Sequence, residues 1–220
     1  MKTVIEIRKI LASLARQRPV FHSEADFQHA LAWEIHQQLP AASIRLELPL
    51  SIGGRTLHLD IWAATEEAVF AIELKYKTRN LEVQRGEEKF RLRNQSAQDI
   101  GRYDFIKDIW RLEQIVEGRE NAVGYAVLLT NESTYWAGES RRPTIDSDFR
   151  LYEGRILEGT LQWGEEASAG TKRGRENPLP LRGRYPLNWQ EYSRIDDRRH
   201  GAFRYLVVEV PNAGKSGGRQ

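Results

Sequence analysis

Cysteine is absent from the 220-residue sequence. The chain therefore forms no disulfide and has no thiolate metal ligand or cysteine nucleophile, so a bound metal would be held by carboxylates, carbonyls or imidazoles, which favours a hard cation. Long apolar runs are missing too, and none approaches the ~20 residues that a membrane-spanning helix needs. Glu6 and Arg8 interrupt the amphipathic N-terminal segment, unlike the core of a signal peptide. We expect a cytoplasmic protein that does not enter a membrane.

The sequence also lacks a large excess of one charge, because 33 Lys and Arg stand against 31 Asp and Glu, a net charge of +2. The total charge neither requires nor excludes a nucleic-acid partner. Basic residues are nevertheless frequent between Lys75 and Arg93, and again between Lys172 and Arg184. Each segment either lines a phosphate path or is a solvated loop whose charge is balanced by nearby acids.

The composition, 40% hydrophobic and 29% charged, predicts one domain over residues 1–210. Apolar residues at helical spacing predict a short helix within residues 3–17. A second helix is predicted from Ser23, an N-cap followed by acidic residues, to Leu39. The polar, glycine-rich tail over 211–220 is predicted to be disordered.

Three strands are predicted next. Apolar residues alternate from Ser43, Gly53 and Gly54 supply a turn, and the chain then continues as a second strand to Trp62, which predicts a hairpin. The segment 68–76 is almost continuously apolar, which is typical of a strand buried on both faces. We expect these strands to form an antiparallel meander.

The segment 77–94 is charge-dense and has no clear period, so we predict a mobile loop there. A long helix from Ser96 to about Glu117 and a buried strand over 123–130 follow. A crossover through a helix pairs the strands that it joins in parallel. These elements give an α/β core over about residues 20–132.

A β-rich extension is predicted over about residues 145–210. It should contain a pair of short strands within 149–163, a flexible loop over 165–177 and a final strand over 203–210.

Three polar residues within the predicted strands are candidates for catalysis. Alternation places Asp60 on one face of the second strand, and Glu73 and Lys75 on one face of the third. In a hairpin closed by residues 65–67 the two carboxylates would lie side by side and could share a divalent cation. The cation would lower the pKa of a bound water, and the lysine would orient that water or neutralise charge that develops on the phosphate. The set therefore suits phosphodiester hydrolysis.

A purely structural interpretation makes Asp60 part of a salt bridge near a turn, and Glu73 and Lys75 the polar edge of a strand. Glu73 lies, however, in the middle of an apolar run, residues 68–76. Burying a carboxylate there costs free energy unless it is paired or binds a metal. The sequence therefore favours the metal site.

Asp60, followed after 12 intervening residues by Glu73-Leu74-Lys75, resembles the Asp and Glu-x-Lys motif of the PD-(D/E)XK nuclease superfamily. The motif alone has little specificity. The predicted order over residues 23–130 is helix, three-stranded antiparallel meander, helix, parallel strand, which is similar to the restriction-endonuclease-like core of that superfamily and covers about half the chain. Leu59 stands where a proline often precedes the aspartate.

The resemblance implies a nuclease that uses Mg²⁺, or Mn²⁺ in its place, bound by Asp60 and Glu73. Many members add a glutamate from the first core helix, and Glu24 is the preferred candidate here, with Glu34 as the alternative. Polar residues near the start of the second core helix often face the catalytic site in this superfamily, which makes Gln98 and Arg102 candidates for nucleic-acid binding. Lys77 and Arg79 from the basic segment join them.

The expected function is metal-dependent cleavage of DNA, in restriction, repair or defence. Two alternatives stay open: a catalytically silent nucleic-acid-binding or interaction module with the same fold, and a nuclease subunit that acts as a homodimer or with a partner subunit. The second alternative arises because the sequence contains no helix-turn-helix, zinc-finger or Walker motif for recognition or translocation. DNA and RNA are not distinguished by these residues.

Overall fold

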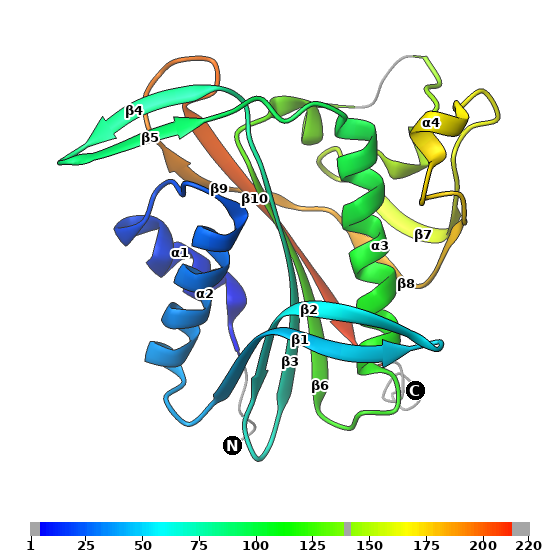
Figure 1. The fold of residues 1–220 in the computed structure, drawn as a ribbon, viewed down its shortest axis with the longest axis horizontal. Coiled ribbons are helices and arrows are strands. Elements are labelled where there is room, and N and C mark those ends of the chain that lie inside the picture. The colour runs from blue at the N-terminus through cyan, green and yellow to red at the C-terminus, as the bar shows by residue number, and fades with distance from the viewer. Residues whose placement is uncertain (1–4, 139–141, 213–220) are drawn as a thin grey trace.

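The computed structural model describes residues 5–138 and 142–212. It shows a mixed α/β fold around a mainly antiparallel six-stranded sheet of order β1-β2-β3-β6-β10-β9, drawn in Figure 1. These strands are β1 (Ser43–Ile52), β2 (Arg55–Ala64), β3 (Val69–Lys77), β6 (Ala122–Thr130), β9 (Trp189–Arg194) and β10 (Ala202–Pro211). The predicted tail falls mostly on residues 213–220, which lie outside the described residues. No helix in the described ranges is long and apolar enough to cross a membrane.

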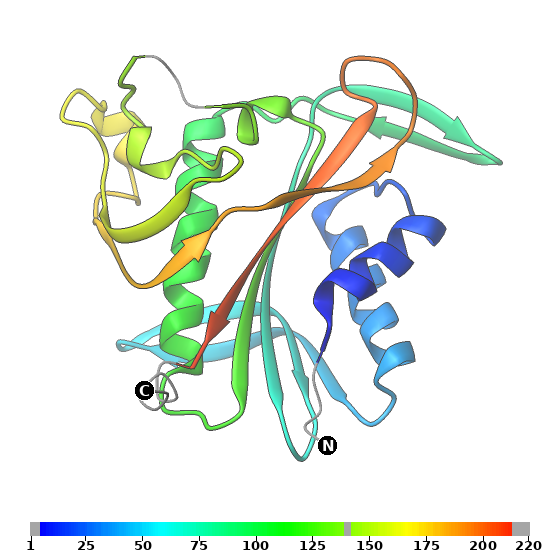
Figure 2. The same ribbon diagram turned by 180° about the vertical axis from the view of Figure 1, so that it is seen from behind.

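Three predicted helices are confirmed: α1 (Ile7–Gln17), α2 (Glu24–Gln38) and α3 (Gln98–Val116). Ser23 caps α2, since its hydroxyl accepts a hydrogen bond from the Asp26 backbone N–H at 3.1 Å. Figures 1 and 2 show α1 and α2 on one side of the sheet and α3 on the other.

The predicted meander and crossover are confirmed. β1, β2 and β3 pair antiparallel in sequence order. Gly53 and Gly54 turn the first hairpin at φ 56° and 74°, a left-handed conformation that glycine adopts without strain. The chain then crosses through α3, and β6 pairs in parallel with β3 from Val69 to Lys77. β3 thus lies inside the sheet, with α2 and α3 on its two faces.

Two apolar cores cover the faces of the sheet. The first lies under α1 and α2 and includes Phe27, Leu31 and Leu74. The second lies under α3 and the C-terminal segment and includes Ile109 and Leu206. Because β3 contributes to both cores, the predicted burial of this strand on both faces is confirmed.

The prediction of a mobile loop over 77–94 was wrong. The chain forms a two-stranded hairpin, β4 (Leu81–Arg85) and β5 (Glu88–Leu92), that turns at Gly86. Its apolar residues alternate, but each strand has only five residues and its other positions are mostly charged, so the period of two was hard to recognise.

The C-terminal extension is β-rich, but its strands differ from the prediction. Instead of two strands within 149–163, a 3₁₀ turn, η2 (Ser147–Phe149), precedes one strand, β7 (Ile156–Leu161). β7 pairs with β8 (Leu179–Pro186), a strand that was not predicted, and the loop between them contains α4 (Ala169–Lys172). The predicted final strand is confirmed as β10, which pairs with β6 and β9 in the main sheet. β9 was not predicted either. Neither the β7–β8 pair nor the addition of β10 to the main sheet can be read from local sequence.

Gly101, in the first turn of α3, packs closely against Tyr135, and an added Cβ would overlap the tyrosine hydroxyl. Overpacking of this kind destabilises by about 1–3 kcal/mol. We expect Gly101→Ala to lower the free energy of unfolding by that amount in urea denaturation. In a Tyr135→Phe background the same change should be nearly neutral, because the next ring atom would lie 3.5 Å from the new Cβ. An equal loss in both backgrounds would contradict this packing.

Candidate active site

The site lies where β2 and β3 separate. The two strands pair from Ile61 to Ala64 and from Val69 to Ile72, and the next residues in that register are Asp60 and Glu73. β3 continues beyond this point in its pairing with β6, and β2 continues in its pairing with β1. The edge of β3 that faces β2 is therefore left without its strand partner from Glu73 onwards.

Two acidic side chains accept hydrogen bonds from the backbone N–H groups of this open edge. The Leu74 N–H donates to Asp60 Oδ2 at 2.5 Å, and the Tyr76 N–H donates to Glu24 Oε2 at 2.6 Å. Each carboxylate thus supplies the acceptor that a neighbouring strand would otherwise provide. The two hydrogen bonds place Asp60 and Glu24 along the same edge of β3.

Glu24 reaches this edge from the first residue of α2. The alternative candidate, Glu34, is buried farther along the same helix and accepts hydrogen bonds from Gln38 at 2.7 Å and Gln17 at 3.4 Å. Of the two glutamates on α2, Glu24 is the one beside the open edge.

A backbone distortion lies on the other side of Asp60. Glu47 of β1 faces Asp60 in the register and has φ 51°, a left-handed conformation that is strained for a residue with a side chain. Gln28 of α2 donates to Glu47 Oε1 at 2.7 Å and to the Asp60 carbonyl at 2.8 Å. The helix therefore holds the backbone of β2 and the Glu47 side chain of β1 at this position.

The carboxyls of Asp60 and Glu73 share a buried environment. Glu73 is 2% exposed, and its Oε1 has no hydrogen-bond partner among the described residues. Burial, followed by the nearby charges of Asp108 and Asp60, raises the pKa of Glu73 far above its usual range. Burial also raises the pKa of Asp60, although Lys75 and the Leu74 N–H oppose the increase. Without a cation the pair holds on to a proton.

Asp108 of α3 is a site residue that the sequence prediction missed. Its side chain is buried, with Oδ2 2.6 Å from Lys75 Nζ and Oδ1 3.3 Å from an Arg111 guanidinium nitrogen. Lys75 Nζ also donates to the Leu74 carbonyl at 3.0 Å. Burial lowers the pKa of Lys75, but Asp108 and Glu24 outweigh it, so the net shift is upward and the ammonium stays charged. The sequence offered one signal for this role: Asp108 is an acidic residue among the apolar residues of α3, next to Ile109.

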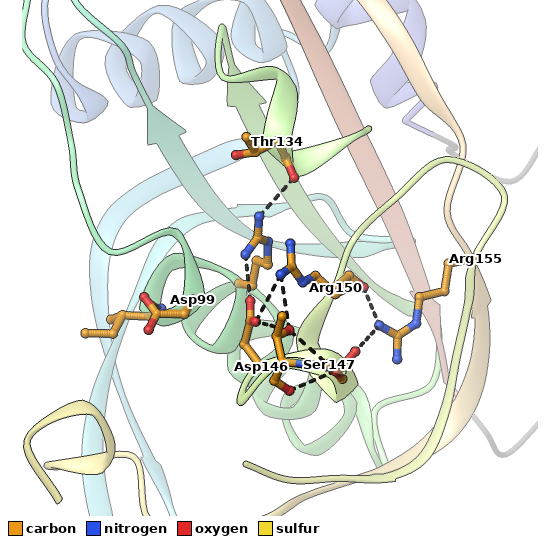
Figure 3. Close-up of polar contacts among 9 residues, drawn as sticks. Asp99, Thr134, Asp146, Ser147, Arg150 and Arg155 are labelled. Atoms are coloured by element: carbon orange, nitrogen blue, oxygen red, sulfur yellow. Dashed lines mark hydrogen bonds and ion pairs between the residues drawn. The ribbon is translucent and has the colours of Figure 1, made fainter. Parts of the chain in front are cut away.

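Arg102, predicted to bind nucleic acid, is instead committed to internal contacts. It is 4% exposed and forms an ion pair with Asp146 at 2.6 Å. It also donates to the Thr134 carbonyl at 2.9 Å. Asp146 also contacts Arg150, whose guanidinium lies 3.3 Å from the Asp146 carboxylate, as Figure 3 shows. The network joins α3 to the loop before η2.

The other three candidates for nucleic-acid binding lie at the end of β3 and the start of α3. Lys77 is half-buried on the face of β3 that carries Lys75. Arg79 forms an ion pair with the buried carboxylate of Glu132. Gln98 is the first residue of α3 and is half-buried. Of the three, Arg79 already has an ion-pair partner within the protein.

Comparisons of the chain with protein-family models, curated proteins and solved structures found no match. Within the described ranges, no three or more His, Asp or Glu side chains are grouped so that they could hold a metal ion by themselves.

Proposed function

We propose that this protein is a Mg²⁺-dependent nuclease that hydrolyses phosphodiester bonds of DNA, with Asp60, Glu73 and Lys75 at the centre of its active site. The observation that carries the proposal is the meeting of two carboxyls where β2 and β3 separate, one of them with a buried oxygen for which the described part of the chain offers no hydrogen-bond partner. A buried carboxylate oxygen without a hydrogen-bond partner is costly, and a cation would remove that cost.

The donor set fits Mg²⁺. This ion usually takes one or two carboxylates from the protein and completes its coordination with water and substrate phosphate oxygens. Asp60 and Glu73 would hold it, and Glu24 lies along the same edge of β3. A preformed group of three acidic ligands is therefore not required. When bound, the ion supplies a Lewis acid for the phosphate and lowers the pKa of a coordinated water.

Lys75 would stabilise the negative charge that develops on the phosphate during attack. Its ammonium stays protonated because Asp108 lies 2.6 Å away. A charge held in place in a largely buried site stabilises a transition state without reorganising first. Asp108 acts as a positioning residue, since it contacts Lys75 and fixes the direction of the ammonium.

The resemblance to the PD-(D/E)XK superfamily supports the same function. The Asp and Glu-x-Lys residues sit within a helix, an antiparallel meander, a second helix and a parallel strand, in the order expected of that core. DNA is the proposed substrate and the cytoplasm the proposed location, and a wild type that binds metal without cutting would indicate the need for a partner subunit.

The test is cleavage of supercoiled, linear and branched DNA with Mg²⁺ or Mn²⁺, combined with thermal unfolding in each metal. We expect the wild type to cut and to unfold at a higher temperature with metal, because a ligand that binds only the folded state stabilises it. Asp60→Asn should lose cleavage and most of the metal-induced shift, while it still accepts the Leu74 hydrogen bond. Glu34→Gln is the matched control on α2. It should keep both DNA cleavage and the metal-induced shift in unfolding temperature.

Two other outcomes would revise the proposal. A wild type that gains stability with metal but cuts no substrate would indicate a subunit that needs a partner. A wild type that neither cuts nor responds to metal would contradict the nuclease and favour the catalytically silent module.

A further inference from the structure

The β4–β5 hairpin has one apolar face, which is docked on the body of the protein. Leu81, Phe90 and Leu92 are buried in the core under α1 and α2, and Val83 packs against it. His22, just before α2, stacks on Phe90 with 4.3 Å between the ring centroids. These contacts fix which face of the hairpin points away from the body.

The opposite face is basic. Lys89 and Arg91 of β5, and Arg93 just after its end, follow one another at every second position, and all three are exposed. Side chains two residues apart on a strand project from the same face about 6.6 Å apart. Glu82 lies across from Arg91 and contacts Lys89 at 2.6 Å and Arg91 at 3.5 Å. One acid thus stands against three basic side chains on this face.

The hairpin is a continuation of the strand that carries the candidate site. Its two connecting segments bond to each other, because Thr78 Oγ1 donates to the Arg93 carbonyl at 2.9 Å and the Gln95 N–H donates to the Thr78 carbonyl at 2.9 Å. The Asn80 N–H also donates to Asn94 Oδ1 at 2.8 Å. Figure 1 shows the hairpin projecting beyond the body at the end of β3.

The basic face and the site both point away from the core under α1 and α2. Figure 1 shows the hairpin on the same side of the main sheet as α1 and α2. The apolar face of the hairpin packs on the core under α1 and α2, so Lys89, Arg91 and Arg93 point away from that core. On β3, Leu74 contributes to that same core, whereas Glu73 and Lys75 point to the face where Asp108 of α3 lies. β4 follows directly after β3, so a nucleic acid on the site could reach the base of the hairpin at the end of β3.

We propose that the β4–β5 hairpin is an arm that binds the phosphate backbone of DNA beside the bond to be cut, through Lys89, Arg91 and Arg93. This inference rests on the proposed nuclease function and adds the surface that holds the substrate. Charged side chains without large apolar neighbours are typical of backbone contacts, which position DNA without reading its sequence.

The length of the arm limits how much DNA it can contact beyond the site. The chain from Lys77 to the turn at Gly86 spans at most about 30 Å at ~3.3 Å per residue, which matches about nine base pairs at ~3.4 Å each. The arm would thus extend the contact to one side of the cut by less than one turn of duplex.

The test measures binding of labelled duplex DNA by fluorescence anisotropy over a range of salt concentrations, without divalent metal and in a Glu73→Gln parent. The arm variant carries Lys89→Gln, Arg91→Gln and Arg93→Gln. The matched control carries Lys9→Gln and Arg16→Gln on α1 and Arg184→Gln on β8, all at exposed positions. Circular dichroism would show that each variant is folded.

We expect the arm variant to lose about three phosphate contacts. Each contact contributes about −0.9 to the slope of log affinity against log salt, so between 50 and 200 mM the affinity of the parent should fall about 40-fold more than that of the arm variant. The control should keep the slope of the parent. An arm variant with the parental slope, beside a wild type that cuts DNA, would overturn the arm and leave the nuclease intact. A parent that binds no DNA, beside a wild type that cuts none, would overturn both.

Discussion

Glu73→Gln is expected to abolish DNA cleavage and, at the same time, to stabilise the metal-free protein. The loss of activity should be at least about 10³-fold, because an amide is a poor ligand for Mg²⁺ and removes a charge from the site. The gain in the free energy of unfolding should be about 1–2 kcal/mol, since the variant no longer buries an ionisable carboxyl beside Asp60 and Asp108. If Glu73 served only in packing, its replacement would not raise stability and remove activity together.

The pH dependence of this stabilisation has a definite sign. The pKa of Glu73 is higher in the folded protein than in the unfolded chain, where it is about 4.3. The folded state therefore binds a proton more tightly, and the wild type loses stability as the pH rises from that value through the folded pKa. The advantage of Glu73→Gln should thus grow with pH, which urea denaturation at mildly acidic and mildly alkaline pH would measure.

Metal should make the wild type more stable than Glu73→Gln, the reverse of their order without metal. Mg²⁺ should stabilise the wild type and leave Glu73→Gln nearly unchanged. Glu209→Gln, at an exposed position of β10, is the control and should alter neither cleavage nor the pH profile. A Glu73→Gln protein that still cuts DNA, or that is less stable than the wild type across the pH range, would refute the assignment of this residue.

Arg102→Met is expected to have the largest effect on folding, a loss of about 3–5 kcal/mol in the free energy of unfolding. Both members of its ion pair with Asp146 are buried, and the removal of one partner leaves the other charge in an apolar setting. Burial alone would raise the pKa of Asp146, but Thr144, Arg102 and Arg150 hold it below its usual range. Arg150 remains in the variant at 3.3 Å and should keep the loss from being larger.

The matched control for this change is Arg175→Met. Arg175 pairs at 2.8 Å with Asp104 of α3, the helix that carries Arg102, but each side chain is more than a quarter exposed. The pair is bidentate, with a second hydrogen bond at 2.9 Å, so it should contribute at the upper end of the range for exposed pairs, about 1 kcal/mol, and still less than the buried pair. Urea denaturation should therefore separate the two variants, and an Asp146→Asn change added to Arg102→Met should cost less than it does alone. Equal losses for Arg102→Met and Arg175→Met would contradict a structural role for the buried pair.

The sequence predicted the elements whose signals are local. Ser23 with its acidic neighbours marked the start of α2, and Gly53 with Gly54 marked the turn of the first hairpin. Strand alternation was enough to put Glu73 and Lys75 on one face of β3, because side chains of a strand alternate whatever surrounds it. The order of the core elements followed from these signals.

The sequence did not predict the contacts that depend on distant partners. Asp108 lies on α3, and nothing in its own neighbourhood in the sequence indicated that Lys75 of β3 would be 2.6 Å away. Arg102 had a nearby acid, Asp99, as a plausible partner, yet it pairs with Asp146, which is 44 residues away. The β4–β5 hairpin was missed because its two strands are short and mostly charged, and the contact of Phe90 with His22 joins residues far apart in the chain.

The sequence by itself therefore determined the order of the core elements and the three residues proposed to carry the chemistry, since both follow from periodicity and turn residues along the chain. Only the tertiary structure decided that β2 and β3 separate at Asp60 and Glu73, that Glu24 bonds to the open edge, and that Asp108 holds Lys75. The physical reason is that burial and charge pairing depend on which surfaces meet, and the surfaces that meet here come from residues far apart in the chain.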